Sequence, residues 1–320
     1  MRVGSVGCGN VGLNTLRACW ERGHEVAGVD PAPGAAQRLA DRFGAAAALP
    51  TLDRLSGFDV VFLCVPTEPI DGTGAADLSI IEGLVENFAG LERHPWWRPP
   101  VLVQRSTCPP GTAARLSGKL RRTAYAVNPS FLAKSTQWLD SDCPSRIAYA
   151  GPSGARALLA RLYSGFPGSP CFASDSYEAV ELLKYIENSI DAVLISLWNE
   201  FLCLADALGV SRSDFLEVLR ATPDRDRFAT TVRVPGGAFG LGCLPKDLRA
   251  IVATCAQHGT AHHVLRAALL TNADVSRRWG GNHLPTSELL HMSGGRVSLT
   301  SRARDVLGGA DQRSPAGGPV

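Results

Sequence analysis

Lysine is scarce in this chain. Of its 32 lysine and arginine side chains, only four are lysines, at positions 119, 134, 184 and 246. Acidic side chains number 30, so the formal net charge at pH 7 is only +2. This balance excludes the strongly basic surface on which nucleic-acid binding depends. We therefore expect a small-molecule partner and no nucleic acid, and a lysine within a functional motif becomes informative.

Long apolar runs and paired cysteines are also missing. The most apolar stretch, residues 190–210, is interrupted by Asp191, Asn199, Glu200 and Asp206, which excludes a membrane span. Nine cysteines occur singly, with no C-x-x-C pair. The first residues resemble a strand rather than a targeting leader. We therefore expect a cytoplasmic protein with free thiols and no membrane association.

Strand-length apolar runs alternate with helical patterns through the first half of the chain. Such alternation predicts a parallel sheet covered by helices on both faces, with ligands at the carboxyl ends of the strands. The expected strands are Arg2–Val6, His24–Val29, Asp59–Val65, Val101–Gln104, Tyr125–Val127 and Arg146–Ala150. The expected helices between them lie near Val11–Arg22, Gly34–Phe43, Asp77–Phe88, Thr112–Leu120 and Gly154–Tyr163.

The first strand is followed by a glycine-rich turn with the pattern G-x-G-x-x-G. Gly7 permits a tight turn, Gly9 lets a pyrophosphate approach the backbone, and Gly12 lets the helix pack closely on the strand. Asp30 closes the second strand, where a carboxylate binds a ribose 2′-hydroxyl and repels a 2′-phosphate. We therefore predict a dinucleotide site that favours NAD over NADP. Its residues are Gly7, Gly9, Asn10, Val11, Gly12 and Asp30.

The second half is dominated by one long helix. Apolar residues recur at three- and four-residue spacings from Ala179 to Leu208, with Asp175 and Glu178 as a capping pair and Gly209 as the stop. The fold class is therefore α/β, an N-terminal Rossmann-type parallel sheet followed by an all-helical domain built on this helix. We expect the boundaries to be 1–173, 174–290 with the glycine-rich loop around Cys243, and a partly flexible tail over 291–320.

Two polar residues on the long helix lie four positions apart. Lys184 and Asn188 therefore share one face, although a solvated lysine and asparagine would give the same spacing. A glycine-rich loop further on ends in Cys243, with Lys246 and Asp247 close behind. Neighbouring cations lower the pKa of a thiol and make it nucleophilic. The loop therefore predicts a reactive Cys243, and the alternative is that Cys243 is an inert buried thiol.

Together these segments resemble the UDP-glucose/GDP-mannose dehydrogenase family over roughly residues 1–280. They occur along the chain in the same order as in that family. The matching pieces are Gly7–Gly12, Val65–Thr67 with Asp71–Gly72 and Asp77–Leu78, Ser106–Thr112, Asn128–Leu132, the helix with Glu181, Lys184, Asn188, Asn199 and Glu200, and Gly242–Asp247.

The resemblance implies an NAD-dependent dehydrogenase that oxidises a primary alcohol of a sugar, nucleotide sugar or similar polar metabolite to a carboxylate. It makes Cys243 the nucleophile of a thiohemiacetal and a thioester. Lys184 and Asn188 would stabilise the oxyanion, and Asp247 would orient or deprotonate water. It also implies a homodimer formed through the long central helix. Further positions that it assigns are Thr67, Thr107 and Lys246 for the cofactor, and Ser130, Phe131, Leu132, Arg227, Phe239 and Gly240 for the substrate.

The chain departs from the family at two places. Ser130 stands where the family usually has glutamate, and a serine hydroxyl cannot act as a carboxylate base near neutral pH. Few residues follow Asn272, so we expect a short member without the family's third, nucleotide-gripping domain.

Two alternative functions therefore stay open beside the four-electron oxidation. One is a two-electron NAD-dependent dehydrogenase, producing an aldehyde or acting like a β-hydroxyacid dehydrogenase. The other is a catalytically degenerate NAD-binding subunit. Cys255, His258, His262 and His263 have spacings compatible with a metal on a helix, but we expect no metal site because the family uses none.

Overall fold

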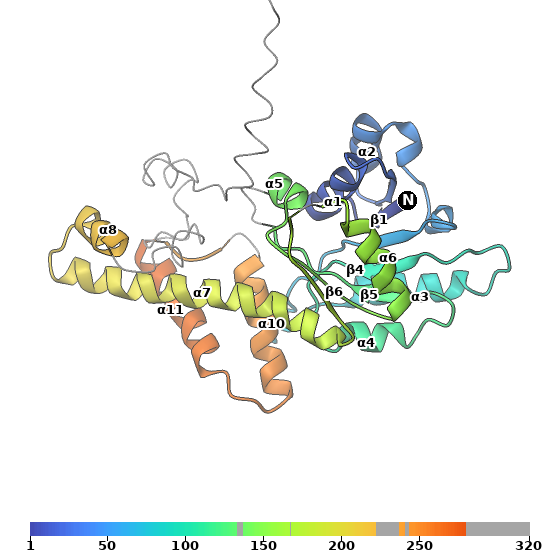
Figure 1. Cartoon of the computed structure of the whole chain (residues 1–320). Coiled ribbons are helices and arrows are strands. Elements are labelled where there is room, and N and C mark those ends of the chain that lie inside the picture. The colour runs from blue at the N-terminus through green and yellow to red at the C-terminus, as the bar shows by residue number, and fades with distance from the viewer. Residues whose placement is uncertain (133–136, 167, 222–236, 241–242, 280–320) are drawn as a thin grey trace, which may run out of the picture.

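The computed structural model describes residues 1–132, 137–166, 168–221, 237–240 and 243–279. Figure 1 shows a layered α/β part and, extending from it, a helical part along α7. The strands are β1 (Arg2–Val6), β2 (Glu25–Val29), β3 (Val60–Leu63), β4 (Val101–Gln104), β5 (Tyr125–Val127), β6 (Ile147–Ala150) and β7 (Cys171–Ser174). The helices of the same part are α1 (Asn10–Trp20), α2 (Ala35–Phe43), α3 (Ser79–Leu91), α4 (Thr112–Ser117), α5 (Gln137–Asp142) and α6 (Ser153–Tyr163), with 3-10 turns at Ala45–Ala47 and Leu52–Leu55. The helical part contains α7 (Tyr177–Ala207), α8 (Arg212–Ala221), α10 (Cys243–Gln257) and α11 (His263–Trp279).

Seven strands form one sheet in the order β2-β1-β3-β4-β5-β6-β7. The first five are parallel, as predicted, but β6 pairs antiparallel with β5 through Val127 and Ala150. The sheet is therefore mostly parallel, with one antiparallel pairing between β5 and β6. An antiparallel neighbour needs no crossover, so the connection from β5 to β6 stays at one edge of the sheet. This places Asn128–Leu132 at the carboxyl edge, where folds of this class bind ligands.

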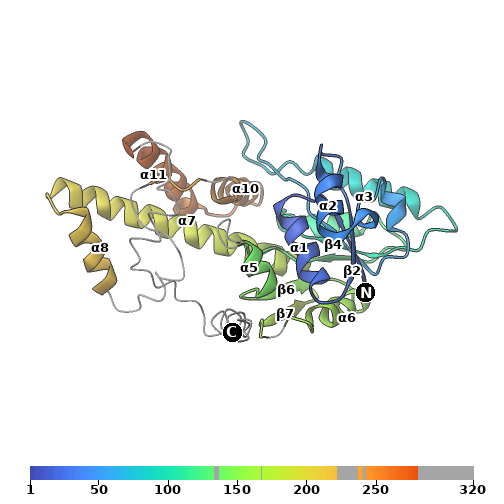
Figure 2. The ribbon, with the colours of Figure 1, turned by 90° about the horizontal axis from the view of Figure 1, so that it is seen from above.

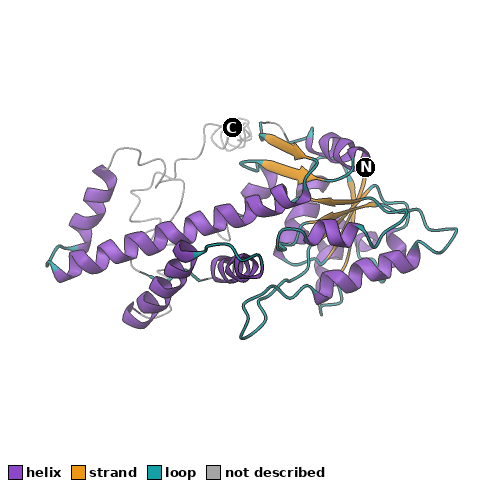
Figure 3. Ribbon diagram, turned by 90° about the horizontal axis from the view of Figure 1, so that it is seen from below, coloured by secondary structure: helices purple, strands orange, loops and turns teal. Residues whose placement is uncertain are grey.

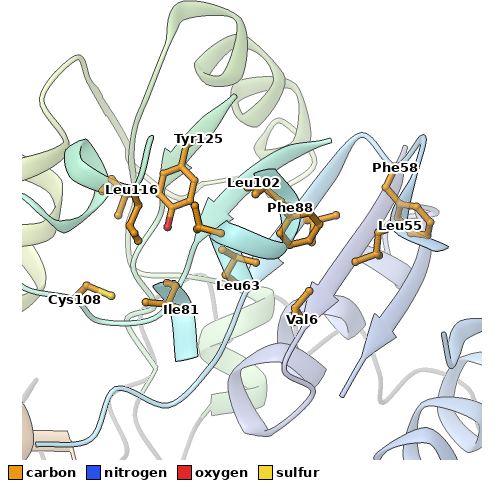
Figure 4. Close-up of a cluster of buried hydrophobic side chains, with 14 of the residues drawn as sticks. Val6, Leu55, Phe58, Leu63, Ile81, Phe88, Leu102, Cys108, Leu116 and Tyr125 are labelled. Carbon is orange, nitrogen blue, oxygen red and sulfur yellow. The ribbon is translucent and has the colours of Figure 1, made fainter. Parts of the chain in front are cut away.

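The sheet is covered on both faces. Along β3, Val61 and Leu63 belong to one buried cluster, whereas Val60 and Phe62 belong to the other, because successive side chains point to opposite faces. Figure 4 shows the first cluster, in which Ile81 and Phe88 of α3 pack on the sheet. The second cluster includes side chains of α1, α2 and α6: Leu16, Ala18, Cys19, Leu39, Ala155, Leu159 and Leu162. Burial of both faces gives the α/β part its two apolar cores.

The long helix α7 begins one residue away from the predicted cap. Ser176 is the N-cap, and its Oγ accepts a hydrogen bond from the backbone N–H of Ala179 at 3.1 Å. Asp175 was expected in that role, but it forms an ion pair with Arg156 instead. Gly209 follows the helix with a φ of 73°, as expected for a glycine stop.

Two further helices, α10 and α11, lie on one side of α7, and α8 lies at the end far from the sheet (Figures 2 and 3). A third apolar cluster joins α7, α10 and α11. Its members are Tyr185, Ala192, Ile195, Phe239, Leu248, Ala250, Ile251 and Ala268. The sequence thus predicted the helix correctly, but a face other than the periodic apolar stripe is buried against α10 and α11.

The periodic apolar stripe of α7 is mostly exposed. Leu182, Ile186, Ile190, Leu197, Phe201 and Leu204 have between 41% and 54% of their surface accessible. Exposed apolar surface of this extent marks an interaction site. Within the described ranges, no helix is both long enough and apolar enough to pass through a membrane.

Candidate active site

The glycine turn lies between β1 and α1, and its geometry requires glycine at two positions. Gly7 has a φ of 85°, and a Cβ there would lie 2.3 Å from the carbonyl oxygen of Cys64. A Cβ on Gly12 would lie 2.0 Å from the carbonyl oxygen of Gly7. Gly9 instead borders open space, with nothing within 4 Å of a Cβ. The turn therefore packs tightly on the sheet and leaves the backbone before α1 accessible, as a phosphate site requires.

Asp30 lies against this turn. Its carboxylate accepts hydrogen bonds from the backbone N–H of Cys8 at 2.6 Å and of Ala32 at 2.7 Å. Cys8 itself is buried, and burial with the nearby Asp30 charge raises the pKa of its thiol to about 12. Cys8 is therefore a packing residue, and Asp30 stands at the end of β2 with lone pairs left for a ribose.

Two segments that follow β3 and β4 are bonded together at the carboxyl edge. The Thr67 hydroxyl is buried and donates to the carbonyl of Thr107 at 2.7 Å. Ser106 Oγ donates to the carbonyl of Val65 at 2.7 Å and accepts from the Val65 N–H at 2.9 Å. Thr67 therefore supports the Thr107 segment with its hydroxyl proton, and its oxygen keeps lone pairs that can accept a hydrogen bond.

Lys184, Asn188, Lys246 and Asp247 form one hydrogen-bonded chain between α7 and α10. Lys184 Nζ donates to Asn188 Oδ1 at 3.2 Å, and Asn188 Nδ2 donates to Asp247 Oδ2 at 2.5 Å. Lys246 Nζ donates to the other carboxylate oxygen at 2.6 Å. Asn188 and Asp247 are only 7% and 2% exposed. The alternative of a solvated lysine and asparagine is therefore wrong.

Cys243 is the first residue of α10 and is exposed, one turn before Asp247. Burial lowers the pKa of Lys184, while the charges of Asp247, Glu187 and Cys243 oppose that shift. A partly desolvated ammonium group can stabilise an oxyanion and can exchange protons more readily than a free lysine. The four residues predicted to be catalytic therefore lie on two packed helices.

The connection after β5 places one aromatic ring, that of Phe131, beside Lys184. Lys184 Nζ lies 5.4 Å from the centre of the Phe131 ring, and the Arg146 guanidinium lies 5.0 Å from it. Both are within the range of cation–π attraction. Ser130 Oγ is buried and makes no hydrogen bond with the described residues. Ser130 and Phe131 therefore belong to the same neighbourhood as Lys184, and Leu132, half-buried, follows them.

The cysteine loop is only partly described, and Arg227 lies outside the described residues. Phe239 is buried in the apolar cluster of the helices, so its side chain is not available to a substrate. Asn272 holds Phe239 at both backbone groups, with distances of 2.6 and 3.0 Å, and Asn199 Nδ2 donates to the carbonyl of Gly237 at 2.9 Å. Gly240 follows this clamp, half-buried. The Asn272 clamp was not predicted, because a lone asparagine on a helix carries no sequence signal.

Among the described residues, no three His, Cys, Asp or Glu side chains come together as metal ligands. Cys255, His258, His262 and His263 are all described and form no such group.

Fold and site together define a Rossmann-type dinucleotide-binding protein with a second, helical part. Two family models match it: the NAD binding domain of the UDP-glucose/GDP-mannose dehydrogenase family over residues 47–166, and the central domain of that family over residues 178–274. A third, described as NADP oxidoreductase coenzyme F420-dependent, matches residues 2–79. The chain belongs to the UDP-glucose/GDP-mannose dehydrogenase family, and the cofactor of its N-terminal domain is NAD.

Curated relatives are similar over most of this chain. UDP-glucose 6-dehydrogenase of Pseudomonas aeruginosa is 30% identical over 85% of this chain and 65% of its own length. GDP-mannose 6-dehydrogenase of the same organism is 29% identical over 86% of this chain and 69% of its own length. The chain thus spans about two thirds of the length of these relatives.

Solved structures agree with this assignment. A UDP-glucose dehydrogenase from Pyrobaculum islandicum superposes with a TM-score of 0.75 at 25% identity, covering 86% of this chain and 68% of that one. A Mycobacterium tuberculosis 3-hydroxyisobutyrate dehydrogenase has a TM-score of 0.65 at 19% identity, covering 91% and 98%. The second likeness shows the fold alone.

The buried Asp247 carboxylate leads to a prediction about stability. In Asp247→Leu, Lys246 and Asn188 lose their partner, so we expect the free energy of unfolding to fall by about 3–5 kcal/mol. Urea unfolding followed by circular dichroism measures this change. Gln257→Ala, at an exposed position of the same helix, should change it by less than about 0.5 kcal/mol. Equal effects of the two substitutions would show that the hydrogen bonds of Asp247 do not hold α7 and α10 together.

Proposed function

We propose that this chain oxidises a primary alcohol of a sugar, nucleotide sugar or similar polar metabolite to the carboxylate by two hydride transfers. The observation that carries the proposal is the chain of hydrogen bonds from Lys184 through Asn188 on α7 to Asp247 on α10, the helix that begins with Cys243. Relatives named UDP-glucose 6-dehydrogenase and GDP-mannose 6-dehydrogenase support a sugar alcohol as substrate. We assign NAD binding to residues 1–173, catalysis and dimerisation to 174–290, and a tail to 291–320.

The residues of the carboxyl edge fit a dinucleotide. The open backbone at Gly9, with Asn10, Val11 and the tight Gly7 and Gly12, suits the pyrophosphate. The Asp30 carboxylate would bind a ribose hydroxyl and repel a 2′-phosphate, which favours NAD over NADP. When bound, NAD accepts hydride from the substrate carbon. We assign further cofactor contacts to Thr107 and Lys246, with Thr67 holding Thr107 in place.

In our proposal Cys243 carries the covalent chemistry. Its thiolate adds to the aldehyde carbon, and the new C–S bond leaves an oxyanion on the former carbonyl oxygen. Lys184 Nζ has two donors beyond its bond to Asn188, and one preorganised donor to an oxyanion lowers the barrier by about 3 kcal/mol. Transfer of the remaining hydride from that carbon to a second NAD would convert the adduct to a thioester. Water then breaks the C–S bond, which returns the thiolate and releases the acid.

Hydrolysis of the thioester would depend on Asp247. The other candidate position holds Ser130, whose hydroxyl cannot serve as a base near neutral pH. Both Asp247 oxygens already accept hydrogen bonds from cationic or amide donors, which orients the carboxylate. Substrate contacts are assigned to Ser130, Phe131, Leu132, Arg227 and Gly240, with Phe239 as a support for Gly240.

A two-electron dehydrogenase is the second candidate. Ser130 favours it, since a site with one carboxylate fewer is less suited to hydrolysis. In that case the product is an aldehyde or ketone, and Cys243 has no covalent role.

Counting NADH per substrate distinguishes the two candidates. We expect a screen of nucleotide sugars, free sugars and other primary alcohols to identify a substrate that yields two NADH and one carboxylate. Cys243→Ala should produce less than about 1% of the acid, because the thioester can no longer form. Cys171→Ala, which removes an exposed thiol on β7, serves as the matched control and should retain the wild-type rate. One NADH per substrate, or undiminished acid from Cys243→Ala, would contradict the covalent mechanism.

The exposed apolar stripe of α7 supports a homodimer. A second copy of the same helix presents a surface of matching chemistry, and the resemblance to the family points to this helix as the contact. We expect sedimentation equilibrium to give twice the chain mass. The double substitution Ile186→Glu and Ile190→Glu should produce a monomer, because it buries charge in the interface. Val264→Glu, at a more exposed apolar position on α11, should leave the dimer intact. A dimeric double variant, or dissociation of Val264→Glu as well, would argue against α7 as the interface.

A further inference from the structure

Glu181 is a buried carboxylate that the proposed reaction does not use. It lies on α7, three residues before Lys184 and seven before Asn188, and is only 2% exposed. These spacings place the three side chains near one another on the same side of the helix. A carboxylate without solvent needs hydrogen-bond partners, and those of Glu181 all belong to the α/β part.

Both carboxylate oxygens of Glu181 are occupied. Oε1 accepts from Gln104 Nε2 and from the Ala113 N–H, each at 2.9 Å, and Oε2 accepts from the Gly111 N–H at 2.8 Å. Gln104 ends β4, and the two amides lie at the start of α4. Gln104 Oε1 is itself fixed by the Tyr125 hydroxyl at 3.1 Å. One side chain of α7 is therefore bonded to two elements of the sheet domain.

The segment that Glu181 binds is continuous with the site. Thr107 and the Ser106 bridge to Val65 lie between Gln104 and Gly111. We propose that Glu181 is a positioning residue, which sets Lys184 and Asn188 at a fixed distance from the Thr107 segment by binding Gln104, Gly111 and Ala113. This inference depends on the proposed function, in which Thr107 faces the cofactor and Lys184 faces the reacting carbon.

The charge state of Glu181 at a given pH follows from its surroundings. Burial raises the pKa of Glu181 to about 7, although its three hydrogen bonds lower it and the charge of Glu178 raises it further. The other titratable side chains around it are Cys108, Tyr125, Tyr177 and Tyr185, whose pKa values are all raised, chiefly by burial, so they stay neutral at pH 8.

The sign of the effect on stability follows from the raised pKa. Since the pKa in the folded protein exceeds that of the unfolded chain, the protonated group stabilises the fold, and this contribution is lost as pH rises through about 7. At pH 8 the ionised carboxylate is therefore a cost to folding. A neutral glutamine of the same shape should be no less stable. It offers only one oxygen to the three donors, however, and its amide would oppose an N–H group.

Glu181→Gln tests the proposal at pH 8, with Glu178→Gln, an exposed carboxylate one turn earlier, as the matched control. We expect kcat to fall about 10- to 100-fold in Glu181→Gln, because small misplacements of catalytic groups have effects of this size. The Kd for NAD should change less than about twofold, because the glycine turn and Asp30 are untouched and Thr67 still holds Thr107. The midpoint of urea unfolding should stay equal or rise. Glu178→Gln should match the wild type in kcat and in the Kd for NAD.

Hydrogen exchange gives a readout that does not depend on turnover. At least one of the Gly111 and Ala113 amides should exchange at least about tenfold faster in Glu181→Gln than in the wild type, since the glutamine leaves one of them without its acceptor. Gln104→Met, which keeps the carboxylate and removes one donor, should show the same loss of kcat in a weaker form. If Glu181→Gln does not fold, the kcat of Gln104→Met tests the proposal instead.

Three outcomes would overturn the proposal: wild-type kcat in Glu181→Gln, unchanged exchange at Gly111 and Ala113, or a Kd for NAD that weakens in parallel with kcat. If the wild-type protein binds NAD but oxidises no alcohol, the proposed function fails, and the exchange rates still decide whether Glu181 holds α7 to α4.

Discussion

The buried carboxylate of Asp247 is the interaction on which the site depends. It lies between the Lys246 ammonium group and the Asn188 amide, almost without solvent. A buried charge is tolerated only when its partners are in place, so α7 and α10 must pack in one register. That register places α10 against the face of α7 that carries Lys184 and Asn188, and it brings the start of α10, with Cys243, to the same end of the helix pair. The arrangement of the catalytic candidates is thus a consequence of satisfying one carboxylate.

A second buried carboxylate, Glu181, joins the same helix to the sheet domain. Its partners are donors from β4 and α4, whereas those of Asp247 come from α7 and from its own helix. The buried face of α7 therefore makes hydrogen bonds both to the sheet domain and to α10. Its outer face is apolar and exposed. Under the proposed function, this division lets one helix position the catalytic groups on its buried face and offer its outer face to a second copy.

Much of the architecture could be predicted because it follows from local chemistry. The glycine turn, Asp30 and the long helix each have a spacing that favours one local structure, and two of the four lysines, Lys184 and Lys246, lie in the matching motifs. Other features have no local signal. The strand β7 has mostly exposed side chains and no apolar run, and the direction of β6 depends on the path of the connection after β5. The burial of Glu181 and the Asn272 clamp depend on partners far away in sequence, which residue spacing does not reveal.

The central claim is that the reaction passes through a covalent bond to Cys243. Mass spectrometry of acid-quenched turnover tests it directly, on the substrate that yields NADH. The account predicts that the peptide containing Cys243 gains the mass of the substrate acyl group in the steady state, and that hydroxylamine removes it as a thioester requires. It also predicts no such adduct on the buried Cys8 or Cys108. Full conversion to acid with the Cys243 peptide unmodified throughout would contradict the account.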